Sequence, residues 1–168
     1  EEFFLSHDHF RLRGQDNFRR YLPVHDIVIR LHPEDDSFQA LARIFAARTV
    51  GCRATVAYPP GGAPGLDVCM DIAAGWHGIE FEELTDGELA KLIFDEKTSR
   101  IRYAAPGRVP GLIYAAAAET GLYIARAPVM MEGRVELLWY LREQSISEDY
   151  HRYGNLGGRS EEDCRPVL

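Results

Sequence analysis

The chain has 168 residues, of which 46% are hydrophobic, 11% aromatic and 27% charged, the proportions of one ordinary globular domain. Its formal net charge is −7, from 19 basic and 26 acidic side chains. Affinity for nucleic acid depends on clustered basic groups that neutralise phosphates, so we expect no nucleic-acid partner. No apolar run approaches the roughly 18 residues that cross a membrane, so we expect no membrane span.

The predicted strands and helices alternate along the middle of the chain. Apolar runs and helical spacing predict strands at 24–31, 54–57, 79–81, 100–104 and 122–125, and helices at 37–49, 66–76, 85–93, 110–120 and 134–144, before an extended segment at 145–150. The clearest start signal is Thr85-Asp86-Gly87-Glu88, which fits a capping box.

The alternation predicts an α/β fold, because connections of this length suit parallel strands joined by crossover helices. We expect an open, mostly parallel Rossmann-like sheet with helices on both faces. Residues 1–22 are polar with no sustained period and are interpreted as a connector to upstream domains. Residues 23–150 form the predicted α/β domain, and residues 151–168 a polar docking tail.

The cysteines and the first residues indicate the setting of the chain. Cys52, Cys69 and Cys164 are far apart and odd in number, which fits neither a disulfide framework nor a CxxC motif and favours the cytoplasm. The sequence starts Glu1-Glu2-Phe3-Phe4, with no Met and no signal-peptide layout. We therefore expect a cytoplasmic domain cut from a longer polypeptide.

Motifs for phosphate binding are absent from the sequence, which contains neither GxGxxG nor GxxxxGK[ST]. The nearest substitute is the run 105–111 between a predicted strand and a predicted helix. Gly107 and Gly111 could present backbone amides to a cofactor phosphate or small anion, with Arg108 beside them. The alternative, which we favour, is a tight loop whose Pro110 starts the helix.

Metal binding and nucleophilic catalysis have weak candidates. His7-Asp8-His9 and His25-Asp26 could supply ligands, but no third zinc ligand is indicated, so we predict no metal site. A cationic neighbour or a helix N-terminus activates a thiol. Cys52 precedes Arg53 but lies where a strand is predicted to begin, so we predict no catalytic cysteine, and no GxSxG elbow exists.

The C-terminal segment concentrates aromatic and basic side chains. Aromatic residues and Arg are the usual anchors of protein interfaces, so we predict that this segment docks onto another surface. The alternative is that its Tyr and His side chains cap the domain's own sheet edge. The predicted docking residues are Tyr150, His151, Arg152, Tyr153 and Asn155.

Both ends of the chain also carry a family resemblance. The run 134–157 (RVELLWYLREQSIS, then YHRYGNLG), with RLRGQDN at 11–17 and RYLP at 20–23, resembles the C-terminal part of bacterial bifunctional proline dehydrogenase/L-glutamate γ-semialdehyde (1-pyrroline-5-carboxylate) dehydrogenases. The second activity of these enzymes belongs to the aldehyde dehydrogenase superfamily.

The middle of the chain resembles an aldehyde dehydrogenase nucleotide-binding domain that has lost its reactive groups. Tyr58 stands where the family has the Lys that holds the cofactor ribose, and the run 103–111 is similar to the family's Gly-rich turn, out of register. Nothing matches the Gly-Gln-x-Cys of the catalytic thiol or the general-base Glu motif. The resemblance therefore implies no catalytic residue and no cofactor in this chain.

Two functions remain open. In the first, the chain is a non-catalytic, aldehyde-dehydrogenase-like C-terminal domain of an oxidoreductase that converts proline to glutamate with NAD and FAD. It would brace the catalytic domains of that polypeptide, cover a passage for the reactive semialdehyde, or support a homo-oligomer. In the second, it is a stand-alone α/β domain that binds a nucleotide or small anion near Gly107–Gly111.

Overall fold

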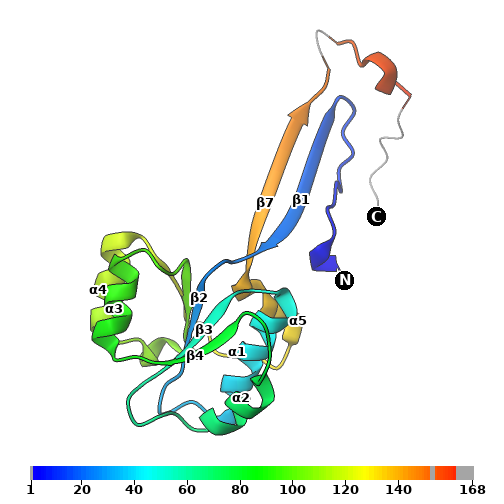
Figure 1. Cartoon of the computed structure of the whole chain (residues 1–168). Helices are drawn as coiled ribbons and strands as arrows, with labels where there is room; N and C mark the ends of the chain where they lie inside the picture. Colours follow the sequence, from blue (N-terminus) through cyan, green and yellow to red (C-terminus); the bar gives the residue numbers. More distant parts are fainter. Residues whose placement is uncertain (1, 152–153, 162–168) are drawn as a thin grey trace. The chain divides into compact units, whose positions relative to one another are not determined.

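A computed structural model describes residues 2–151 and 154–161 of the chain (Figure 1). The chain divides into two compact units. Unit 1 comprises the described residues of 1–22 and 142–168, and unit 2 comprises Pro23–Leu141. No helix among the described residues is both long enough and apolar enough to cross a membrane.

Unit 2 is built on a five-stranded sheet in which every neighbouring pair of strands is parallel. Its central strand, β2, is buried along its whole length, as expected of a strand covered on both faces. The strands are β2 (Ile27–Arg30), β3 (Ala54–Tyr58), β4 (Ile79–Glu83), β5 (Arg100–Arg102) and β6 (Tyr123–Ala125), in the spatial order β4-β3-β2-β5-β6.

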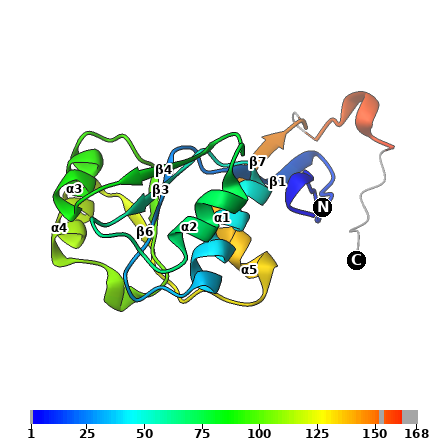
Figure 2. The ribbon, with the colours of Figure 1, turned by 60° about the horizontal axis from the view of Figure 1, so that its bottom comes forward.

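Helices cover both faces of this sheet, which confirms the predicted α/β class. The helices α1, α2 and α5 lie on one face and α3 and α4 on the other (Figures 1 and 2). Their bounds are α1 (Ser37–Val50), α2 (Leu66–Ala73), α3 (Asp86–Phe94), α4 (Gly111–Thr120) and α5 (Gly133–Leu137).

Local sequence signals explain where the helices begin and end. Asp36 caps α1 by accepting from the backbone N–H of Gln39 at 2.7 Å, and the Gln39 side chain accepts from the Asp36 N–H in return. The predicted capping box of Thr85 and Glu88 is confirmed at the start of α3. Gly51 ends α1 at φ 83°, a left-handed conformation that glycine adopts without steric cost.

Apolar packing between the sheet and α3 and α4 forms one continuous core cluster. Its buried members come from the strands, from the loops that follow them and from one stripe of each helix: Val28, Ala57, Leu84, Leu89, Ala90, Ile93, Ile101, Tyr103, Val109, Ile113 and Ala116. This arrangement follows from the two-residue period of strands and the helical spacing in the sequence.

Unit 1 contains a two-stranded sheet of β1 (Gln15–Pro23) and β7 (Leu141–Asp149). The predicted helix at 134–144 is therefore wrong beyond Leu137, since a 3₁₀ turn at Leu138–Tyr140 follows α5 and β7 begins at Leu141. Tertiary contacts override the local helical spacing, because the buried Tyr140 accepts through its carbonyl from the Val24 N–H at 2.8 Å.

Two further differences concern the ends of the chain. Residues 1–22, interpreted as a connector, contain most of strand β1. The α/β unit ends at Leu141 rather than at residue 150. Both differences have one cause: β1 and β7 pair across the whole length of the sequence, which no local pattern reveals.

Candidate functional site

The strand order defines where this fold would bind a ligand. In open parallel sheets, ligands bind beyond the carboxyl ends of the strands where the strand order reverses. In unit 2 that reversal lies between β2 and β5. The candidate site is therefore the crevice between the loop 31–36, which follows β2, and the loop 103–110, which follows β5.

A side chain of the second loop bridges this crevice. The Arg108 guanidinium donates through Nη1 to Asp35 Oδ1 at 2.5 Å and to Gln39 Oε1 at 2.7 Å. Its Nη2 donates to the Glu34 carbonyl at 3.0 Å. The Arg108 side chain is only 14% exposed. The cation predicted to meet an anion is thus already bound to residues of the facing loop and of α1.

Asp35 is the centre of this cluster. Its carboxylate is fully buried and also pairs with Arg43, whose side chain is fully buried as well. Arg43 donates further to the carbonyls of Gln39 and Arg30, each at 2.8 Å. Burial lowers the pKa of the Arg43 guanidinium, while the Asp35 charge raises it. The chain satisfies these charges internally, as buried charges require.

The start of α1 is unsuited to a cofactor pyrophosphate. A helix N-terminus binds phosphate through free backbone N–H groups and its positive dipole end. Here Asp36 occupies the Gln39 N–H, and Asp35 and Asp36 both place carboxylates at this end of the helix. A phosphate entering the crevice would find the Gln39 N–H occupied by Asp36 and the Arg108 guanidinium occupied by Asp35.

The three residues predicted to bind a cofactor lie together in one loop. Gly107 lies in the short 3₁₀ turn Pro106–Arg108, and Gly111 is the first residue of α4. Pro110 is the N-cap of α4, as the tight-loop alternative predicts, and it makes no side-chain cap bond. The engagement of Arg108 leaves this loop without a free cation, and its role in ligand binding stays a prediction.

A second buried ion pair joins β5 to α5. Arg102 donates from Nε and Nη2 to the two carboxylate oxygens of Glu136 at 2.9 and 2.8 Å, with side chains 0% and 3% exposed. The Tyr140 hydroxyl donates to Glu136 Oε1 at 3.3 Å. Only Lys91 and Lys97 among the 19 basic residues are lysines. This excess of arginine was the available signal for buried pairs, since the planar guanidinium suits them.

The described cysteines are inert. Cys52 and Cys69 are both buried and free. Burial raises the pKa of the Cys52 thiol to about 11, and it raises the pKa of Cys69 as well. Since the thiolate is the reactive form, neither thiol is activated. Cys164 lies outside the described residues.

The histidines near the N-terminus form no metal site in the described part of the chain. The His7 and His9 rings stack with their centroids 5.0 Å apart and their planes at 8°. Within residues 2–151 and 154–161, no group of three or more metal-ligating side chains comes together.

Two of the predicted docking residues lie against the start of the two-stranded sheet in unit 1. The Tyr150 hydroxyl accepts from the Gly14 N–H at 3.1 Å, and the Tyr150 N–H donates to the Gly14 carbonyl at 3.0 Å. His151 Nδ1 lies 3.1 Å from the same carbonyl. Tyr150 also packs under the Arg159 guanidinium, 3.7 Å from its ring centroid. These contacts match the alternative in which Tyr and His cap the chain's own sheet.

Of the remaining predicted docking residues, Asn155 makes a local hydrogen bond. Asn155 accepts from the Gly157 N–H at 2.8 Å, which closes a local turn. Arg152 and Tyr153 lie outside the described residues. Docking through this segment therefore stays a prediction.

One face of the two-stranded sheet exposes apolar side chains that no local pattern in the sequence indicates. Hydrogen bonds join Gln15 to Asp149 and Arg20 to Gln144, and this register places Phe18 opposite Ile146. β1 and β7 run side by side in opposite directions (Figure 1). Phe18 and Ile146 are each 39% exposed, and Leu22, two pleats along the same face from Phe18, is 36% exposed.

Comparison with solved structures gives a match to a much longer protein. The chain is similar to a solved structure of proline utilization A (PutA) from Corynebacterium freiburgense, with 26% identity over 89% of this chain and a TM-score of 0.54. The match covers 12% of that chain, so this sequence spans only a small part of its relative's length. It supports a domain related to proline utilization A within a larger polypeptide.

The other comparisons add no functional information. Methylglyoxal synthase from Elizabethkingia anophelis matches 89% of this chain and 99% of its own, at 10% identity and a TM-score of 0.42. No protein-family model matches the sequence. No curated protein matches it either.

Proposed function

We propose that the chain is a non-catalytic, aldehyde-dehydrogenase-like C-terminal domain of a cytoplasmic proline-catabolic oxidoreductase, and that it acts by contact. Its parent would oxidise proline through 1-pyrroline-5-carboxylate and glutamate semialdehyde to glutamate, with FAD and NAD bound in other domains. The similarity to proline utilization A supports the proline-catabolic setting. The chain itself would brace the catalytic domains, cover the path of the semialdehyde, or join two copies of the enzyme.

The observation that carries a contact role is the exposed apolar face of β1 and β7. A two-stranded sheet alone is marginally stable in water, and contiguous exposed apolar side chains mark interaction surfaces. Phe18 and Ile146 face each other across the two strands, each 39% exposed, and Leu22 (36% exposed) lies on the same face beyond the hydrogen-bonded Arg20 and Gln144. A companion surface that covers them would remove apolar area from water and stabilise unit 1.

The state of the crevice supports a role without cofactor. Arg108 and Asp35 join the two loops between which a dinucleotide would enter. Opening this site would separate a nearly buried cation from a fully buried carboxylate, which is costly in a low-dielectric interior. We infer that the scaffold of a nucleotide-binding fold has been retained without its ligand.

The test introduces charge on the apolar face within the full-length polypeptide that carries this chain. We expect Phe18→Asp and Ile146→Asp to lower the oligomer mass measured by analytical ultracentrifugation, or to slow proline-to-glutamate flux while each half-reaction keeps its own rate. Leu112→Asp is the matched control, because Leu112 is an exposed apolar residue (49%) on α4, outside the two-stranded sheet. Unchanged mass and flux in both variants would remove the basis of the proposal.

A further inference from the structure

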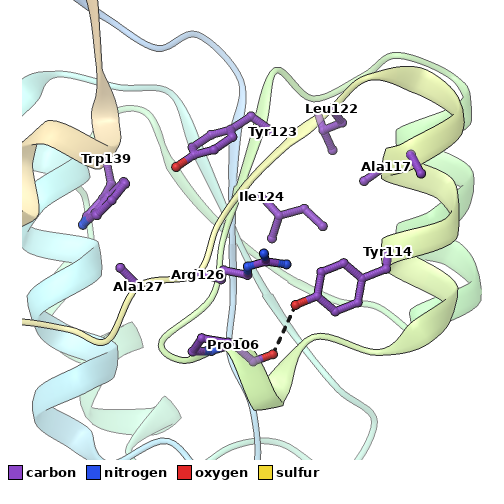
Figure 3. A pocket seen from close by; sticks show the side chains of 10 residues that line it. Pro106, Tyr114, Ala117, Leu122, Tyr123, Ile124, Arg126, Ala127 and Trp139 are labelled. Carbon is purple, nitrogen blue, oxygen red and sulfur yellow. Dashed lines mark hydrogen bonds between the residues drawn. The ribbon is translucent and has the colours of Figure 1, made fainter.

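Unit 2 has a cavity on the side of α4 that faces the edge strand β6, separate from the crevice between β2 and β5 (Figure 3). Its volume is about 560 Å³, within the range of small-molecule sites. Ala117, Leu122 and Ile124 line its apolar side, and three aromatic rings, Tyr114, Tyr123 and Trp139, stand around it.

Each of the three rings has an arginine guanidinium against it. Arg126 lies 5.0 Å from the Tyr114 centroid, Arg100 lies 5.2 Å from that of Tyr123, and Arg102 lies 5.7 Å from that of Trp139. These distances are those of cation–π contacts. These contacts hold the three rings in place.

Arg126 differs from the other two arginines in being available to a ligand. Arg102 is neutralised by Glu136, and Arg100 donates to the Trp139 carbonyl at 2.6 Å. Arg126 is exposed, lines the cavity and forms no ion pair with any residue in the described ranges 2–151 and 154–161. Figure 3 shows its guanidinium between Ile124 and the Tyr114 ring, directed into the cavity.

The residues that line the cavity favour an anionic ligand. No carboxylate is among the described residues that line it, so an anion would meet no repulsion there. The cation–π contact with Tyr114 holds the Arg126 guanidinium beside that ring, and the paired N–H groups of a guanidinium match a carboxylate. The rings and alanines offer apolar contact to the rest of the molecule.

We infer that this cavity binds a small amphipathic carboxylate, with the carboxylate on Arg126 and a planar or branched apolar group among Tyr114, Tyr123 and Trp139. The inference does not depend on the proposed function. It concerns a different part of unit 2 from the closed crevice, and it involves no residue of β1 or β7.

The test uses the 168-residue chain and 3-phenylpropionate as the probe. Trp139 fluorescence, followed in a Trp76→Phe background, and titration calorimetry report binding. We expect saturation with a Kd on the order of 1 mM, as the size of the probe allows. Neither 3-phenylpropanol, which lacks the charge, nor propionate, which lacks the ring, should saturate in the same range.

Two variants locate the site. Arg126→Gln should weaken binding of 3-phenylpropionate about tenfold or more, because it removes a charge-assisted hydrogen bond. Arg134→Gln is the matched control, since Arg134 is 82% exposed and outside the cavity, and it should leave binding unchanged. Ala118→Phe, at an exposed position of the lining, should block binding by filling the space.

Any of three results would overturn the inference. The first is the absence of saturable binding by the folded chain. The second is equal affinity for 3-phenylpropanol, which would leave no role for the cation. The third is unchanged affinity in folded Arg126→Gln or Ala118→Phe, which would place the bound probe elsewhere.

Discussion

Replacing Asp35 by Asn tests whether the ion-pair cluster of the crevice holds unit 2 together. The Asp35 carboxylate accepts from Arg43, from Arg108 at 2.5 Å and from the His32 N–H at 3.0 Å. An asparagine keeps the shape but has one acceptor oxygen, and its NH₂ would face a guanidinium donor. The variant therefore loses the charge and part of the hydrogen bonding while changing almost no volume.

The burial of Arg43 determines how much free energy of unfolding the Asp35→Asn variant loses. Arg43 is fully buried, so the variant leaves a cation in the interior without its counter-ion. Breaking a buried pair in this way costs about 3–5 kcal/mol. This is a large share of the roughly 5–15 kcal/mol by which a domain is stable. At about 2–4 °C per kcal/mol, Tm should fall by roughly 6–20 °C.

The control is the same substitution in an exposed pair. Asp26 pairs with Arg53, whose side chain is 72% exposed, so Asp26→Asn should cost less than about 1 kcal/mol. Asp26 has φ 54°, a conformation that asparagine also accepts. Urea unfolding followed by circular dichroism gives both free energies of unfolding. Equal losses in the two variants would refute the claim that the buried cluster stabilises unit 2.

Two further predictions concern single titrating groups. The Arg159 guanidinium hydrogen-bonds Asp16 and holds the pKa of that carboxyl below 3.8, so the stabilisation should be present above pH 3.8 and lost as the pH falls through the lowered value. In a carbon-13 NMR titration, Arg159→Gln should raise the Asp16 pKa toward 3.8, and an unchanged pKa would contradict the contact. With a pKa of about 11, Cys52 has roughly one part in 1,000 as thiolate at pH 8. In a Cys164→Ser background, Cys52 and Cys69 should therefore react with a thiol reagent only after denaturation, and rapid labelling of the native chain would show that burial does not protect them.

Local signals in the sequence were sufficient for the five parallel strands of unit 2 and for its helices up to α4. The capping box at Thr85, the N-cap at Asp36 and the stop at Gly51 are each decided by contacts within a few residues. Hydrophobic runs located the five parallel strands for the same reason. The alternation of these elements then fixed the α/β class, because parallel strands require crossover helices.

Long-range pairing explains what the sequence did not reveal. The strands β1 and β7 come from opposite ends of the chain, and neither has an alternating apolar pattern, so 134–144 was assigned as a helix throughout. The same limit applies to the crevice. Arg108 was recognised as a candidate cation, but its partner Asp35 is 73 residues away, and only the strand order brings the two loops together.

Titration of the 168-residue chain with NAD⁺ by calorimetry tests most directly whether the nucleotide crevice is closed. The Arg108–Asp35 bridge and the carboxylates at the start of α1 predict no saturable heat up to roughly millimolar NAD⁺. Micromolar binding that disappears in Arg108→Ala would contradict this account, because it would show that Arg108 serves a cofactor and not the facing loop.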